Sequence, residues 1–233
     1  MNRRWFRLCG RLMGLFVFLT GAASGEISSV LRTRWAAQVN PELPWPEYPR
    51  PTMVRSEWQN LNGHWELAIT PTNAPRPTEW PLRILVPYPV ESALSGVGRR
   101  VSPAERIWYR RTFTVPEQWR GRRVLLHFGA VDWETVVFVN DREIGCHRGG
   151  YDAFSFDITE ALRPGPTQTV VVSVWDPTNA GHQPRGKQHL NPHGIWYTSV
   201  SGIWQTPWLE PVPRAHICSL HIAPRVSDHS VEV

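Results

Sequence analysis

The chain has 233 residues, of which 41% are hydrophobic and 19% charged, and it contains 22 prolines and 13 tryptophans. This length and composition exclude a coiled coil, a long helical bundle, wholesale disorder and a complete multi-domain enzyme. The formal net charge is +5, but residues 1–25 hold four arginines and no acid, so 21 basic and 20 acidic residues remain elsewhere, and nucleic-acid binding is not indicated.

Residues 1–25 have the pattern of a secretory signal peptide. Arginines crowd residues 3–11, an apolar run covers 12–19, and small residues fill 21–25. The apolar run is far shorter than the roughly 20 residues that cross a bilayer, so we expect no stable membrane anchor. The pair Arg3-Arg4 also resembles a twin-arginine signal. We therefore expect export to the periplasm or the extracellular space.

Cysteine and histidine give no sign of a metal or cofactor. Removal of the signal leaves Cys146 and Cys218, whose pairing in an oxidising compartment the sequence leaves open. His182, His189 and His193 lie close together, but a proline interrupts the last interval and no acid accompanies them at metal-binding spacing. We expect loop histidines, and neither a metal nor a cofactor.

The rest of the chain predicts an all-β sandwich or jelly roll. Residues 26–53 are rich in proline and indicate an extended lead-in, while Asn140-Asp141 marks a tight hairpin. Single helical turns are expected at 118–121 and 159–162. Short apolar stretches between turn residues are typical of such folds. The candidate strands are 64–69, 82–86, 107–115, 124–128, 135–139, 143–147, 169–175 and 203–209.

The last residues indicate a further strand. Apolar and polar residues alternate over 215–222, and a second apolar stretch covers 230–233. One or two strands cannot bury a hydrophobic face alone. We therefore interpret 213–233 as the first strands of another domain.

Six segments follow one another in an order known from a protein family: 55–65 (RSEWQNLNGHW), 86–92 (VPYPVES), 108–116 (WYRRTFTVP), 128–141, 147–159 and 201–206 (SGIWQT). Together they resemble the amino-terminal sugar-binding domain of glycoside hydrolase family 2, which includes β-galactosidases, β-glucuronidases and β-mannosidases. The resemblance covers about residues 55–212. It implies a galactose-binding-like jelly roll over 54–212, and it implies that 213–233 begins an immunoglobulin-like domain.

In the family, both catalytic glutamates lie on a (β/α)₈ barrel, which needs roughly 200 residues or more. We therefore expect this chain to lack the barrel and to hold no catalytic residue. Asp132 and Glu134 lie two apart on an apparent strand, and a pair of carboxyls is what glycoside hydrolysis requires. We interpret them as polar residues on the solvated face of that strand.

Sugar recognition is the chemistry that the remaining residues favour, because aromatic rings take the apolar face of a pyranose while carboxylates and amides take its hydroxyls. The long connection after residue 175 is rich in Pro and Gly, and such loops usually carry binding residues. Trp196 and Tyr197 are the aromatic candidates, with Lys187, the only lysine, nearby. The resemblance to β-galactosidases implies an acidic sugar contact at Asp176, with Glu91 at the same rim.

Glucuronide specificity is not supported, because β-glucuronidases place an acid where this chain has Trp196-Tyr197. Our leading hypothesis is an exported carbohydrate-binding domain of a β-galactosidase-like protein, whose partner is a β-glycoside or polysaccharide. The alternatives are a stand-alone secreted binding module and a poorly folding relic with an exposed barrel-facing surface. Coding sequence beyond Val233 would distinguish them.

Overall fold

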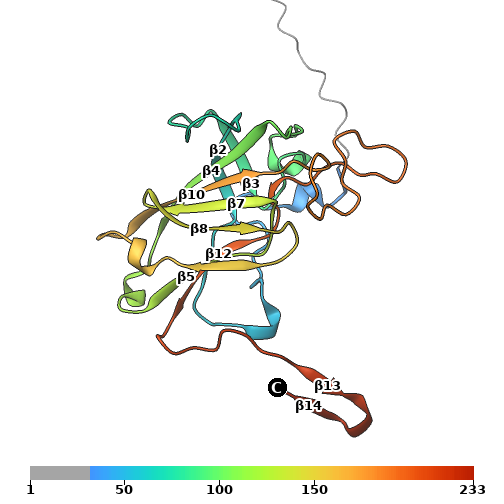
Figure 1. Cartoon of the computed structure of the whole chain (residues 1–233). Helices are drawn as coiled ribbons and strands as arrows, with labels where there is room; N and C mark the ends of the chain where they lie inside the picture. Colours follow the sequence, from blue (N-terminus) through green and yellow to red (C-terminus); the bar gives the residue numbers. More distant parts are fainter. Residues whose placement is uncertain (1–31) are drawn as a thin grey trace, which may run out of the picture. The chain divides into compact units, whose positions relative to one another are not determined.

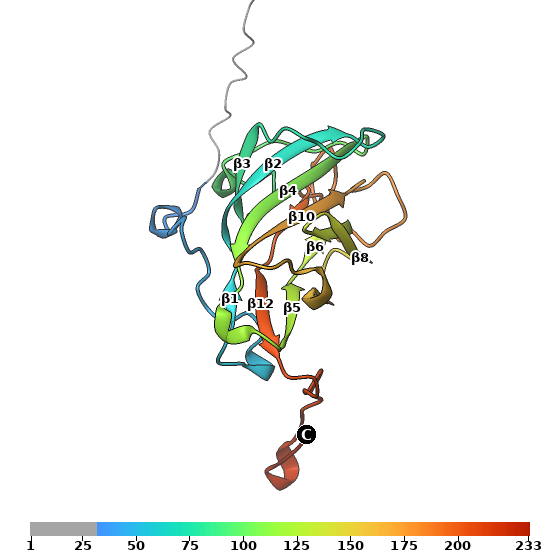
Figure 2. The same ribbon diagram turned by 90° about the vertical axis from the view of Figure 1, so that its left-hand side faces the viewer.

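Alternating apolar and polar residues build two antiparallel sheets around a shared core (Figures 1 and 2). The structure, a computed structural model, describes residues 32–233. The larger sheet has the order β3-β2-β4-β10-β7-β8, and the smaller has the order β1-β12-β5-β9. The larger sheet contains β2 (Gly63–Pro71), β3 (Leu82–Val86), β4 (Glu105–Thr114), β7 (Glu134–Val139), β8 (Arg142–Arg148) and β10 (Thr167–Trp175). The smaller contains β1 (Gln59–Asn60), β5 (Arg123–Phe128), β9 (Phe154–Asp157) and β12 (Pro207–Val212).

The core confirms the predicted all-β class and explains the sandwich. Trp65, Tyr109 and Phe128 are among the largest fully buried side chains, and they come from strands of both sheets. Burying aromatic side chains of this size dominates the energetics of a core. The strand β10 lies between β4 and β7 in the middle of the larger sheet. The loop that follows Trp175 therefore begins at a strand end held by neighbours on both sides.

Two further strand pairs lie outside the main sheets. The strand β6 (Val131–Asp132) pairs with β11 (Gly202–Ile203), and β13 (Ala223–Arg225) pairs with β14 (Ser230–Glu232). The helical segments of the described chain are single 3₁₀ turns, and none of them has the length and apolar character needed to cross a bilayer. They are η1 (Ala36–Gln38), η2 (Pro51–Met53), η3 (Ala93–Ser95), η4 (Glu117–Trp119), η5 (Thr159–Ala161) and η6 (Val226–Asp228).

Most predicted elements are present, with three corrections. The turn at Asn140-Asp141 has positive φ at both residues (49° and 70°), as a type I′ hairpin between β7 and β8 requires. The single strand predicted over 203–209 is wrong, because β11 and β12 are separate and pair with different strands. The strand predicted over 215–222 is also wrong, because the pairing begins only at β13. The strands β1, β6, β9 and β13 were not among the predicted elements.

From residue 32 the proline-rich lead-in consists of turns, bends and the 3₁₀ turns η1 and η2, and its end at residues 48–50 lies against the smaller sheet. Glu210 of β12 has a fully buried side chain, and its Oε2 is 2.8 Å from Arg50 and 2.6 Å from Arg55. The Tyr48 hydroxyl also donates to Glu210, and His127 Nε2 lies 3.2 Å away. Burial raises the pKa of Glu210, but hydrogen bonds from His127 and Tyr48 and the charge of Arg50 lower the pKa overall, below its usual range.

The residues after β12 lead away from the sandwich (Figures 1 and 2). Ile217, Val226, Val231 and Val233 are between 59% and 82% exposed. The sandwich therefore covers little of this segment. Its interpretation as the first strands of an immunoglobulin-like domain stays a prediction. The predicted signal peptide falls on residues outside those that the structure describes.

Candidate functional site

Three acidic residues from separate strand ends lie beneath one loop. Glu91 follows β3, Asp132 lies on β6, and Asp176 directly follows β10. Asp132 and Asp176 are 3% and 2% exposed. The pairing of β6 with β11 places Asp132 opposite Gly202, the neighbour of Ser201. We call Glu91, Asp132 and Asp176 the acid cluster.

Asp176 ties together the two ends of the 177–201 loop. Its Oδ1 accepts a hydrogen bond of 2.6 Å from the backbone N–H of Thr178, and its Oδ2 accepts one of 2.6 Å from the Ser201 hydroxyl. The backbone N–H of Ser201 donates to Glu91 Oε2 at 2.9 Å. Ser201 therefore joins two members of the acid cluster, and the loop starts and ends on the same carboxylate.

Gln188 fixes the middle of the loop. Its Nε2 donates to Asp132 Oδ2 at 2.8 Å and to the Tyr151 hydroxyl at 3.0 Å, and its Oε1 accepts from the backbone N–H of Val200 at 2.6 Å. The side chain is buried, so these bonds are shielded from competing water. The loop is thus held to the sandwich at its start, its middle and its end.

Burial raises the pKa of all three carboxyls in the acid cluster. The pKa values of Glu91 and Asp132 rise to about 7, and the charge of Asp176 raises both further. The pKa of Asp176 is also raised by burial, although bonds from Ser201 and Thr178 oppose this. No ion pair among residues 32–233 includes any of the three. Glu91 and Asp132 are therefore partly protonated near neutral pH.

The same loop presents other side chains outward. Two backbone hydrogen bonds of 2.8 Å join Tyr197 to Lys187 and His189, one on each side of Gln188. Gln188 points inward to Asp132, whereas its neighbour Lys187 is exposed.

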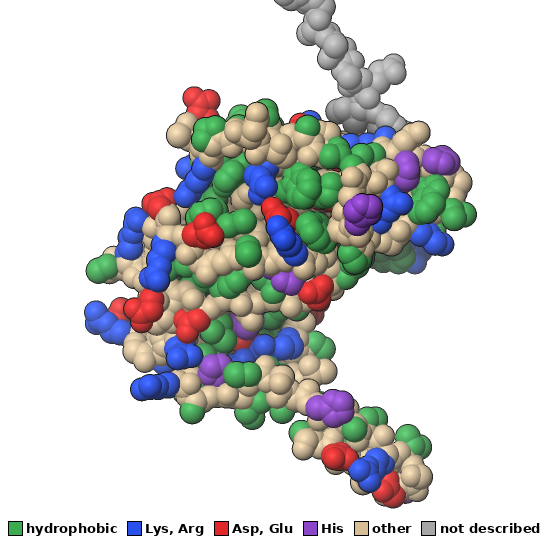
Figure 3. Space-filling view, viewed as in Figure 1, with side chains coloured by type: hydrophobic (Ala, Val, Ile, Leu, Met, Phe, Trp, Pro, Cys, Tyr) green, Lys and Arg blue, Asp and Glu red, His purple; other side chains and the backbone are tan. Residues whose placement is uncertain are grey.

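Aromatic and basic side chains gather on this outward surface. Tyr197 is 63% exposed, and Lys187 Nζ lies 5.9 Å from its ring centroid. Trp196 is half-buried, with the Arg185 guanidinium 5.5 Å and the His189 ring 5.9 Å from its ring centroid. Figure 3 shows purple, blue and green side chains together at the upper right, where Figure 1 places this loop. We call Arg185, Lys187, His189, Trp196 and Tyr197 the basic aromatic patch.

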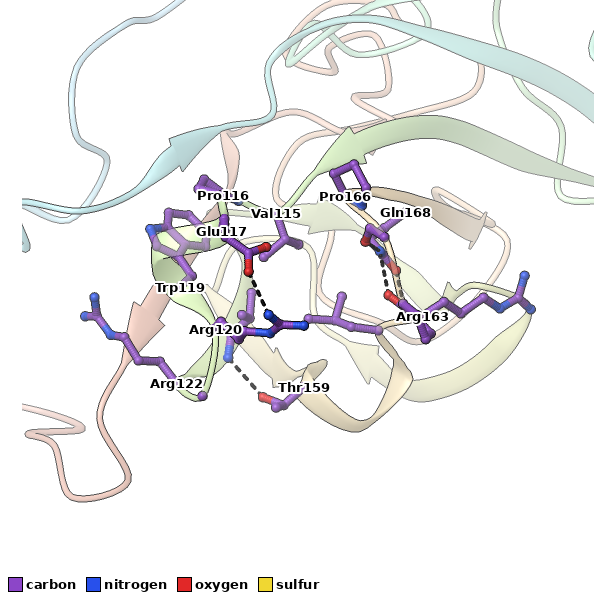
Figure 4. A pocket seen from close by; sticks show the side chains of 15 residues that line it. Val115, Pro116, Glu117, Trp119, Arg120, Arg122, Thr159, Arg163, Pro166 and Gln168 are labelled. Atoms are coloured by element: carbon purple, nitrogen blue, oxygen red, sulfur yellow. Dashed lines mark hydrogen bonds and ion pairs between the residues drawn. The ribbon is translucent and has the colours of Figure 1, made fainter.

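A separate pocket of about 280 Å³ lies between the segments 115–124 and 159–168 (Figure 4). Its polar side chains bond mainly to one another and to the nearby backbone. The Arg120 guanidinium donates to Glu117, Thr159 Oγ1 accepts from the backbone of Val124, and Gln168 bonds the backbone of Arg163. We therefore place the candidate site at the loop and not in this pocket.

The comparison with protein families identifies the domain that carries this loop. The family model described as "Glycosyl hydrolases family 2, sugar binding domain" matches residues 78–206, more than half of the chain. This chain belongs to glycosyl hydrolase family 2. The matched residues run from just before β3 to just before β12, and they include the acid cluster and the whole 177–201 loop.

Relatives of this family 2 domain are longer enzymes. A β-glucuronidase of Paenibacillus borealis is 32% identical over 146 residues, which are 60% of this chain and 24% of that protein. A β-galactosidase of Thermoanaerobacter pseudethanolicus is 31% identical over 128 residues, which are 54% of this chain and 16% of that protein. The chain therefore spans a quarter or less of the length of these curated relatives.

Solved structures confirm the fold. A β-D-glucuronidase of Dictyoglomus thermophilum is similar with a TM-score of 0.55 and 20% identity, over 79% of this chain and 32% of that one. A β-glucuronidase of Ruminococcus gnavus is similar with a TM-score of 0.53 and 22% identity, over 70% and 30% of the two chains.

Two glycines of the family 2 segments make room for the site. Gly202 has φ +89°, and a Cβ there would lie 1.9 Å from the Tyr109 hydroxyl oxygen. A Cβ at Gly150 would lie 2.5 Å from Asp132 Oδ1. Glycine is therefore required at both positions for the backbone to pass so close to the core tyrosine and the acid cluster.

The structure brings the five predicted site residues to one loop and its support, but in two layers. Asp176 and Glu91 belong to the buried acid cluster, and both oxygens of Asp176 accept hydrogen bonds. Lys187, Trp196 and Tyr197 belong to the outward patch. Their contact with sugar stays a prediction for all five.

Sequence reasoning missed the residues that hold the site together. Asp132 was interpreted as part of a solvated strand face, but it is buried on β6, while Glu134 lies on β7 and pairs with Arg148 at 2.8 Å. The interpretation fails because these two strands belong to different sheets. Ser201 lies in segment 201–206, one of those that resemble the family, so the sequence could have indicated its importance. Nothing in the sequence distinguishes Gln188.

The cysteines lie outside this site, and the histidines of the loop form no metal centre. Cys146 and Cys218 are both free and exposed. His182, His189 and His193 lie on the loop, and within the described chain no group of three or more His, Cys, Asp or Glu side chains is arranged to hold a metal ion.

Proposed function

We propose that this chain is the carbohydrate-binding domain of an exported, β-galactosidase-like family 2 protein, and that the 177–201 loop binds the sugar. The observation that carries the proposal is the pairing of exposed aromatic rings with a buried anchor. Tyr197 and Trp196 are open to a ligand, while Asp176, Gln188 and Ser201 fix the loop beneath them. A rigid loop binds with little loss of conformational entropy.

The acid cluster serves this site as support. With Asp176 engaged by both loop ends, a sugar hydroxyl would have to displace Ser201 or Thr178 to reach its carboxylate. We therefore assign Asp176 first to positioning the loop and retain a direct sugar contact as a proposal. Glu91 acts in the same way through Ser201.

Hydrolysis is not assigned to the described residues. A glycosidase needs two carboxyls that flank the scissile bond, roughly 5–5.5 Å apart in retaining enzymes. The carboxyls of the acid cluster lie beneath the loop, and Asp132 and Asp176 are almost fully buried. We propose that a barrel outside this chain cuts the bond, as the resemblance implies.

Export is part of the same proposal and is supported by the arginine-rich start and the apolar run of residues 1–25. A sugar-binding domain in the periplasm or outside the cell would meet glycans directly.

The test is glycan retention by the purified chain, measured on an array of β-galactosides, β-glucuronides and β-mannosides. We expect Trp196→Ala and Tyr197→Ala each to weaken binding at least about tenfold, because each removes an aromatic contact surface. Trp35→Ala is the matched control, since Trp35 is 55% exposed and has Arg34 4.4 Å from its ring centroid, outside the loop. Equal retention by all three variants would refute the loop as the sugar site.

A further inference from the structure

We propose that the basic aromatic patch selects saccharides that carry a negative charge, as a uronic acid carboxylate or a sulfate ester. The proposal rests on the proposed function and names the ligand class of the same loop. It is carried by the charges of the loop, by their lack of acidic partners and by their placement over aromatic rings.

The 177–201 loop carries basic side chains and no acidic ones. Residues 177–201 contain Arg185, Lys187 and three histidines, and they contain no aspartate or glutamate. Arg100 adds a further cation, because its Nη1 donates to the backbone carbonyl of Leu190 at 3.3 Å. Outside residues 1–25 the chain is nearly neutral overall, so this excess is local.

These cations have no acidic partners within residues 32–233. Arg100, Arg185 and Lys187 take part in none of the ion pairs there, whereas many other arginines do, among them Arg106 and Arg110 with glutamates. A contact with an aromatic ring orients a cation without neutralising its charge. The patch therefore holds cations that are positioned and available.

The acids that hold the loop lie beneath it and not on the patch. Asp132 and Asp176 are 3% and 2% exposed, and their hydrogen bonds run to Gln188, Ser201 and Thr178. The raised pKa values of Glu91 and Asp132, about 7, also reduce their negative charge at neutral pH. A ligand that approaches the loop from outside meets cations first.

The side chains suit an anionic sugar in their chemistry. A planar guanidinium donates two parallel hydrogen bonds to a carboxylate or a sulfate, and a lysine ammonium adds a point charge. Arg185 and Lys187 lie beside Trp196 and Tyr197, so the anionic group and the apolar face of one ring can be bound together. A neutral sugar would use only the aromatic part.

The experiment compares polygalacturonate with its neutral methyl ester, a neutral galactan and a sulfated galactan. Binding to the wild-type chain and to the double variant Arg185→Gln/Lys187→Gln is measured by calorimetry at low and high salt. We expect the wild type to bind an anionic polymer at least about tenfold more tightly than its neutral form, because hydrogen bonds to charged groups are the strong ones. The preference should fall with added salt.

The double variant should lose this preference, so that it binds the charged and the neutral polymers equally. Arg120→Gln/Arg142→Gln removes the same charge from exposed positions outside the loop, and it should keep the preference. Whether carboxylate or sulfate is favoured identifies the anion. A double variant that prefers the anionic polymer as strongly as the wild type would overturn the inference. Equal wild-type binding of charged and neutral polymers would overturn it while the proposed function stands, and no binding to any polymer would overturn both.

Discussion

Gly202 shows how one residue controls the approach of the loop to the core. Its backbone pairs with Asp132. The backbone N–H of the next residue, Ile203, donates a hydrogen bond of 3.3 Å to the Tyr109 hydroxyl oxygen. Tyr109 is fully buried, so its ring has no free space into which it could move. The position combines a positive φ with a close contact, and these two demands can be separated experimentally.

We expect Gly202→Ala to lower the free energy of unfolding by about 3 kcal/mol, from the sum of left-handed strain and overpacking. Gly165→Ala is the control, because Gly165 has a similar φ (+96° against +89°) but no atom within 4 Å of an added Cβ. It should cost only the strain, about 1 kcal/mol. Urea unfolding measures both, and equal losses would show that contact with Tyr109 is unimportant.

At the scale of the element, the stability of the closed 177–201 loop depends on the protonation of the acid cluster beneath it. Opening the loop would expose Asp132, Asp176 and Glu91, whose bonds to Gln188 and Ser201 hold it closed. Tyr109 of β4 faces the cluster, and burial raises the pKa of this phenol, so it stays uncharged near neutral pH. The pH response should therefore come from the carboxyls themselves.

We expect the loop to become less stable as pH rises from about 4 to about 7. The pKa values of Glu91 and Asp132 are about 7 in the folded chain and about 4 when unfolded. The closed state thus binds more protons in this window, so its stability is greatest below pH 4 and declines until the folded pKa is passed. Hydrogen-exchange protection of the Val200 and Ser201 amides, corrected for intrinsic rates, measures this.

Asp132→Asn should flatten that pH response, because asparagine keeps an acceptor for Gln188 while one titrating charge is removed. Glu143→Gln, at an exposed position on β8, is the control and should leave the response unchanged. Protection that rises with pH in the wild type would contradict the assignment.

The elements were largely predictable because the core imposes alternation over five or more residues. Val170, Val172 and Val174 of β10 are buried on one face, and the Asn140-Asp141 turn has one preferred geometry. The two-residue strands β1, β6 and β11 were missed because two residues carry no period. Such strands are defined by their partners, not by their own sequence.

The outward half of the site was predictable and the inward half was not. Trp196 and Tyr197 stand out as aromatic residues in a Pro/Gly-rich connection. The burial of Asp132 depends on its pairing with Gly202, which is 70 residues away in the sequence. Gln188 lies among similar polar residues, so only the folded chain distinguishes it.

At the scale of the whole described chain, one buried carboxylate connects segments from both ends of the sequence. Glu210 on β12 binds Arg50 of the lead-in and Arg55 just after it, and Arg55 also donates to the carbonyl of Ile217 beyond the sandwich. His127 of β5 stacks on Trp208 with ring centroids 4.7 Å apart, beside the same carboxylate. The lead-in is thus part of the folded domain and not a free linker.

We expect Glu210→Gln to lower the free energy of unfolding at pH 7 by about 3 kcal/mol, because it leaves Arg50 and Arg55 without their carboxylate at a buried site. The pKa of Glu210 is lowered in the folded chain, so its carboxylate stabilises the fold at pH values above the unfolded pKa of about 4. This stabilisation is lost as pH falls from the unfolded pKa through the folded pKa. The difference between wild type and variant should therefore shrink in acid. Glu117→Gln breaks an exposed pair with Arg120 and should cost at most about 0.5 kcal/mol. If urea unfolding gave both variants the same midpoint at pH 7, the network around Glu210 would not be what holds the lead-in to the sandwich.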